Sequence, residues 1–111
     1  MTPQDDIVNL AQRKASQSRC RYKVSAVGLD RKGRVLGCTM NRHRLSHRGG
    51  GVHAEIALIR KYGERLRSII ICRTNKRGDL LDIHACPACA QVASKLKIKI
   101  YSIKEILKEE V

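Results

Sequence analysis

The sequence predicts an α/β protein, a three-layer α/β/α sandwich in which helices cover both faces of a mixed sheet of four to five strands. Helical and extended patterns alternate along the chain, and a turn signal joins the first two extended segments. A continuous apolar run at 68–72 is typical of a strand buried on both faces. With 111 residues, we expect one domain spanning 1–111.

The first part of the chain is predicted to form a helix and a β-hairpin. A helix is expected over 3–18, because Pro3 suits a first helical position and apolar residues then recur on one face. Strands are expected over 22–29 and 35–40. Residues 30–33 end in glycine, which can adopt the positive φ that a tight hairpin turn needs.

The rest of the chain is predicted to alternate helices and strands. In chain order we expect a glycine-rich loop over 41–51, a helix over 54–62, a strand over 68–72, a turn over 76–79, a helix over 87–96, a strand over 98–101 and a helix over 104–110. Gly63 and Pro87 support two of these helix boundaries, as a C-cap and a first helical residue. Because the helices after 54 and 87 are crossovers, they should share one face of the sheet with adjacent N-termini.

The strong positive charge favours a phosphate-bearing partner. The chain has 23 Lys and Arg against 10 Asp and Glu, a formal net charge of +13. Such an excess is typical of proteins that bind nucleotides or nucleic acid, although it also keeps a protein soluble. Phe and Trp are absent and Tyr occurs three times, so few rings are available for stacking on bases. A nucleoside, a nucleotide and a single-stranded nucleic acid all remain candidate substrates.

Localisation is predicted from what the sequence lacks. No apolar run approaches the roughly 18 residues of a membrane helix, and the first residues do not resemble a signal peptide. Five cysteines, an odd number, fit a reducing compartment better than a disulfide framework. We therefore expect a cytoplasmic protein without membrane contact, whose small core favours assembly into a homo-oligomer.

Two short motifs supply metal-binding and acid–base groups. One is His53-Ala54-Glu55, and the other is Cys86-Pro87-Ala88-Cys89; each lies at the predicted start of a helix, where the helix dipole favours a thiolate. One imidazole and two thiolates are good Zn²⁺ ligands and leave a fourth position open for water. Glu55, two residues after His53, is placed to act as a base.

This combination, H-x-E followed by a P-C-x-x-C-like string, resembles the cytidine and deoxycytidylate deaminase superfamily, which includes polynucleotide-editing and tRNA-adenosine branches. The resemblance runs from about Tyr22 to Ser102. It implies that Zn²⁺ is the cofactor, that His53 and the two motif cysteines are its ligands, and that Glu55 carries protons. The implied reaction is hydrolytic: water adds to C4 of cytosine or C6 of adenine, and ammonia leaves.

Four residues are expected to contact the substrate. The resemblance implies that Asn41, which ends the second predicted strand, binds a sugar, and that Tyr101 supplies an aromatic ring near the base. Ala54, between the ligand and the acid–base residue, is expected at the same site. Arg44, just upstream in a basic loop, has a guanidinium group suited to a substrate phosphate.

The chain departs from the family pattern near the second motif. Ala85 stands where a proline is usual, and Ile83 and His84 stand where many members carry Ser or Thr. Lys97 occupies a turn that is commonly glycine. None of these changes removes a predicted ligand or Glu55, so they bear on the identity of the substrate.

Other functions are less well supported. A thiol–disulfide oxidoreductase also uses C-P-x-C, but only 22 residues follow Cys89, and the sole other proline, Pro3, is badly placed for that fold. A non-catalytic zinc-binding nucleic-acid module needs a fourth protein ligand, which His84, His43 or His47 can supply. We therefore expect a zinc-dependent deaminase of a cytosine-type base, with the adenosine branch as the main alternative.

Overall fold

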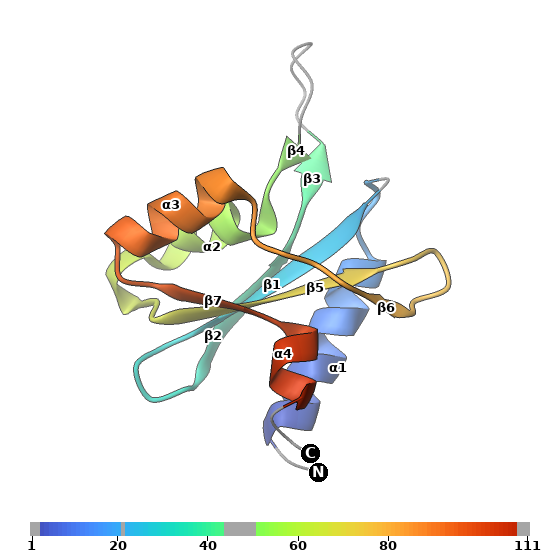
Figure 1. Ribbon diagram of the computed structural model, residues 1–111, viewed down its shortest axis with the longest axis horizontal. Helices are drawn as coiled ribbons and strands as arrows, with labels where there is room; N and C mark the ends of the chain where they lie inside the picture. The colour runs from blue at the N-terminus through green and yellow to red at the C-terminus, as the bar shows by residue number, and fades with distance from the viewer. Residues whose placement is uncertain (1–2, 21, 44–50, 109–111) are drawn as a thin grey trace.

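A computed structural model describes residues 3–20, 22–43 and 51–108. Figure 1 shows a twisted central sheet with helices on both of its faces. The elements are α1 (Pro3–Ser16), β1 (Lys23–Leu29), β2 (Val35–Met40), β3 (Arg42–His43), β4 (Gly51–Val52), α2 (Ala54–Tyr62), η1 (Gly63–Arg65), β5 (Ser68–Thr74), β6 (Leu80–Leu81), α3 (Pro87–Lys95), β7 (Lys99–Ser102) and α4 (Ile103–Lys108).

The main sheet is mixed and has five strands, which agrees with the predicted fold class. β2, β1 and β5 are antiparallel neighbours in that order, and β7 runs parallel to β5. β6 pairs with the last two residues of β5, whereas β7 pairs with its first four. β1 pairs with one edge of β5. β6 and β7 both pair with the opposite edge of β5, so the sheet is four strands wide.

One apolar core lies on each face of the sheet, between the strands and the helices that cover that face. The sheet and its two helical coverings are the three layers of the fold. The core under α1 and α4 includes Ala11, Val27 and Ile70. The core under α2 and α3 includes Leu58 and Ile71. Alternate residues of β1 and β5 enter opposite cores, which explains why both strands are apolar almost throughout.

The first hairpin turn is held by Asp30. Its Oδ1 accepts hydrogen bonds from the backbone N–H groups of Lys32 and Arg34, both at 2.9 Å. These bonds and the Arg34 guanidinium, 3.0 Å from Oδ2, lower the pKa of the Asp30 carboxyl. Gly33 has φ +79°, the positive value that the sequence predicts for this turn.

The structure adds three short strands to the predicted elements. β3 and β4 pair with each other within the predicted loop over 41–51, and β6 follows the turn after β5. Each has two residues, too few for an alternating pattern to show in the sequence. The last helix begins one residue earlier than expected, and its predicted end at 110 lies outside the described residues. Within the described ranges, no helix is long and apolar enough to cross a membrane.

Candidate active site

The two predicted ligand motifs lie side by side at the N-termini of α2 and α3, on the same face of the sheet (Figure 1). His53 is the N-cap of α2 and Cys86 is the N-cap of α3, with Pro87 as its first helical residue. The carbonyl oxygens of both caps accept the first bonds of their helices, from Ala57 at 3.1 Å and Ala90 at 2.8 Å. Neither cap side chain bonds its own helix, so both are available for a ligand.

The start of α2 is anchored to the sheet through β2. The Thr39 hydroxyl donates a hydrogen bond to the backbone oxygen of Ala54 at 2.7 Å. At the other end of α2 the Tyr62 ring lies against Gly37, where a Cβ atom would overlap it. These contacts fix the height and rotation of α2, and therefore the position of His53 and of the buried Glu55.

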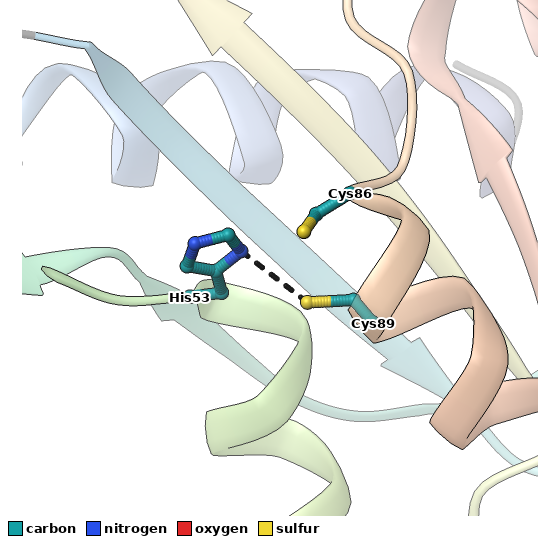
Figure 2. A group of neighbouring side chains, drawn as sticks. All are labelled: His53, Cys86 and Cys89. Atoms are coloured by element: carbon teal, nitrogen blue, oxygen red, sulfur yellow. Dashed lines mark hydrogen bonds between the residues drawn. The ribbon is translucent and has the colours of Figure 1, made fainter. Parts of the chain in front are cut away.

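His53, Cys86 and Cys89 converge in space, as Figure 2 shows. Their potential ligand atoms all lie within 4.8 Å of one another, and His53 Nδ1 is 3.3 Å from Cys89 Sγ although the residues are 36 positions apart. Tetrahedral zinc, with bonds of about 2.0–2.3 Å, places its ligand atoms roughly 3.5–3.8 Å apart. The donor set and its spacing therefore fit Zn²⁺, and no fourth side chain joins the group among the described residues.

Burial controls the chemistry of Cys89, which is 2% exposed. That burial, with smaller contributions from the charges of Glu55 and Cys86, raises the pKa of the Cys89 thiol to about 12. The expected helix-dipole preference for a thiolate is thus outweighed at this residue. A cation reverses such a balance, because a metal-coordinated thiol is deprotonated outright. Once deprotonated by coordination, the two thiolates would balance the charge of a divalent metal.

Glu55 lies beside this group and is 4% exposed. It is in the first turn of α2, next to the ligand positions but outside the convergent set. It is one of the groups that raise the pKa of the Cys89 thiol. A buried carboxylate next to an open metal position is placed to exchange protons with a water molecule or a substrate there.

The additional histidines do not close the site among the described residues. His84 is exposed and does not join the convergent group. The side chain of His43 and the whole of His47 lie outside the described residues.

Two of the predicted substrate-contacting residues, Ala54 and Asn41, have different surroundings. Ala54 is fully buried and belongs to the core under α2 and α3. Asn41 Oδ1 accepts hydrogen bonds from Ser18 Oγ at 2.6 Å and Val24 N at 3.1 Å, while its Nδ2 donates to the Tyr22 oxygen at 2.6 Å. Its amide therefore ties the segment after α1 to the sheet, and one of its two N–H groups has no partner in the part of the chain that the structure describes.

Tyr101 is not brought to the group formed by His53, Cys86 and Cys89. Tyr101 pairs with Ile70, whose side chain belongs to the core under α1, so the two side chains share that face of the sheet. The metal group lies on the opposite face. Arg44 lies outside the described residues.

Sequence reasoning did not single out Arg73, which lies on the same face of the sheet as His53, Cys86 and Cys89. Arg73 follows Ile69 and Ile71 at alternate positions of β5, and both isoleucines belong to the core under α2 and α3. Its guanidinium carbon lies 4.7 Å from the centre of the Tyr22 ring. A charge that continues the inward alternation of an apolar strand is the sequence signal for this residue.

Comparison with known proteins gives one family. The profile described as the cytidine and deoxycytidylate deaminase zinc-binding region matches residues 1–104. No curated protein sequence matches the chain.

Several solved structures share the fold. Cytidine deaminase from Mycobacterium leprae has a TM-score of 0.63 and 23% identity, covering 94% of this chain and 91% of that chain. A single-substitution variant of cytidine deaminase from Mycobacterium tuberculosis has a TM-score of 0.61 and 24% identity, with 90% and 82% covered. The unsubstituted enzyme from the same organism has a TM-score of 0.56 and 23% identity, with 84% and 82% covered.

Proposed function

The chain belongs to the cytidine and deoxycytidylate deaminase zinc-binding family, and we propose that it converts a cytosine-type base to uracil with release of ammonia. As a member of that family it is a zinc-dependent deaminase. The observation that carries the proposal is the convergence of His53, Cys86 and Cys89 within 4.8 Å, with the buried carboxylate of Glu55 beside them. The family description names two compounds that both contain cytosine, which favours cytosine over adenine.

In this proposal one imidazole and two thiolates hold the metal. Zinc, when bound, supplies a Lewis acid that lowers the pKa of water to about 7. His53 approaches from the exposed side of the site and Cys89 from its buried side, with Cys86 between solvent and core. A metal held by these three residues would border solvent on the side of His53, from which a flat base could reach it.

Glu55 is proposed to move the protons. It accepts a proton from the attacking water and passes it to the ring nitrogen N3, and it then takes the second proton from the hydroxyl now on C4 and gives it to the amino group that leaves. One water is consumed, the C4–N bond breaks, and uracil and ammonia form. The low exposure of Glu55 keeps bulk water from competing for these protons.

A chromatographic assay of the zinc-loaded protein tests the substrate class. The panel contains deoxycytidine, deoxycytidine 5′-monophosphate, cytosine, adenosine and a single-stranded oligonucleotide with one target base. Conversion of any cytosine-containing member to its uracil counterpart is the expected result. Conversion of adenine alone would replace the proposal with the adenosine alternative, and no conversion at all would contradict it.

A further inference from the structure

Arg73 lies where the two ligand-bearing segments converge. It pairs across the sheet with Leu81 of β6, and the chain from there leads directly to Cys86. On its other side Arg73 pairs with Val24, whose carbonyl oxygen accepts the backbone N–H of Asn41 at 3.0 Å.

Asn41 connects Arg73 to the other predicted ligand segment, the one that carries His53. β3, which follows Asn41, pairs with β4, and His53 comes directly after β4. Arg73 is two residues beyond Ile71 on the same face, about 6.6 Å farther along the strand. The side chain therefore lies on the face of the sheet that carries α2 and α3, where its guanidinium contacts the Tyr22 ring.

The guanidinium of Arg73 lacks the partners that a half-buried cation normally has. Among the described residues, its Nε is shielded from solvent and has no hydrogen-bond partner, and neither ion pair involves it. Its contact is with the face of Tyr22, a ring that is 57% exposed. Residues 44–50, which lead to β4 and His53, contain neither Asp nor Glu in their sequence.

Stacking on a ring orients a guanidinium but does not satisfy its N–H groups, and a desolvated cation without an anion is costly. Planar guanidinium forks match the oxygens of a phosphate, with two parallel hydrogen bonds. A substrate whose base occupies the metal site would carry its phosphate several ångströms from that base, and Arg73 is a cation on the same face of the sheet that could receive it.

We propose that Arg73 is a specificity-determining residue that binds the phosphate of the substrate, with Tyr22 holding the guanidinium plane in place. This inference rests on the proposed function, because a cytosine-type base at the metal site fixes where the phosphate lies. It makes the preferred substrate a nucleotide, either free or within a polynucleotide.

The test compares Arg73→Gln with the unchanged protein, both loaded with zinc. Equilibrium binding is measured for deoxyuridine, deoxyuridine 5′-monophosphate and a short single-stranded oligonucleotide containing one deoxyuridine, none of which is a deamination substrate. Steady-state kinetics are measured for the matching deoxycytidine compounds. Loss of charge-assisted hydrogen bonds predicts about 10- to 100-fold weaker binding of the phosphate-bearing ligand, with the nucleoside unchanged. In the steady-state kinetics, the weaker binding should appear mainly as a higher KM.

Two further variants separate binding from general effects. Arg31→Gln removes the same charge from the hairpin at the far end of β1, about 20 Å away along the strand, and should leave all the constants unchanged. Arg73→Lys keeps the charge without the planar fork and should recover part of the affinity. Should Arg73→Gln prove unstable, this second variant still gives the comparison of nucleotide with nucleoside.

Each outcome decides the proposal. A selective loss with the mononucleotide or with the oligonucleotide supports it and identifies the source of the phosphate. An equal loss for nucleoside and nucleotide, or no loss with any ligand, overturns it. If no deoxycytidine compound is deaminated while binding of the phosphate still depends on Arg73, then the proposed function fails and the phosphate site stands.

Discussion

A substitution of Glu55 can test catalysis separately from metal binding. Glu55 is buried in the first turn of α2 and lies outside the set of convergent ligand atoms. Replacing it by Gln keeps its size and removes its ability to take a proton. We expect Glu55→Gln to lower kcat by about 10²- to 10⁴-fold, the usual contribution of general acid–base catalysis. Zinc content should stay equimolar with the chain, as measured by metal analysis.

Two comparisons make this prediction specific. Glu64→Gln is the same substitution at an exposed residue of η1 and should leave kcat unchanged. Cys86→Ala removes a proposed ligand and should lower both zinc content and the melting temperature, because metal binding is coupled to folding. Full activity in Glu55→Gln, or loss of zinc from it, would show that this carboxylate does not have the proposed role.

At the scale of elements, the turn after α3 contains backbone strain. Lys97 has φ +61°, and it is the one non-glycine residue with positive φ in the described part of the chain. It follows the C-cap Leu96 at the position where glycine commonly ends a helix. A side chain costs roughly 1–2 kcal/mol in the left-handed region.

We therefore expect Lys97→Gly to raise the free energy of unfolding by about 0.5–1 kcal/mol, since the gain is offset in part by the greater freedom of glycine in the unfolded chain. Urea unfolding measures the change. Lys95→Gly is the matched control in the last turn of α3, and it should destabilise by about 1 kcal/mol. If Lys97→Gly lowered the free energy of unfolding as much as Lys95→Gly does, the turn would not be strained.

The length of an element decides whether the sequence predicts it. α2, α3 and β5 have enough residues for a periodic pattern and were predicted to within about two residues at their ends. β6 is too short for such a pattern, and it forms because β5 offers an open edge beside β7.

Some residues of the site could likewise be predicted from the sequence, and others could not. His53 and Cys86 begin helices that a crossover topology must place together, so their convergence could be predicted. The partners of Asn41 come from 17 to 23 positions away, where no local pattern reports them. Arg73 becomes conspicuous only when its unpartnered Nε and its neighbours in space are known.

At the scale of the whole molecule, thiols are part of the apolar interior. The chain has no Phe or Trp, and its cores are built from Ile, Leu, Val, Ala and Cys. Cys72 is fully buried in the core under α1, and Cys38 packs against the same core from β2. Burial raises the pKa of each thiol to about 11, from an ordinary value of 9.0. Lys14 near Cys38 and the Ser25 hydrogen bond to Cys72 oppose this rise only in part.

These shifts predict that the fold weakens in alkaline solution. Below pH 9 both thiols are protonated in the folded and unfolded states, so their contribution to stability is fully present. Between pH 9 and pH 11 they ionise in the unfolded chain but stay protonated in the folded one, which favours unfolding. Allowing for the partial exposure of Cys38, we expect a loss of about 1–3 kcal/mol over that interval.

Urea unfolding of the zinc-loaded, reduced protein at pH 7, 9 and 10.5 measures this loss. Lysine and tyrosine also titrate in this range, so the comparison that decides is with Cys38→Ala. That variant has a smaller core and lower stability at every pH, but it lacks one of the two shifted groups and should lose less between pH 9 and 10.5. Parallel stability curves for the two proteins would show that the buried thiols do not set the alkaline limit of the fold.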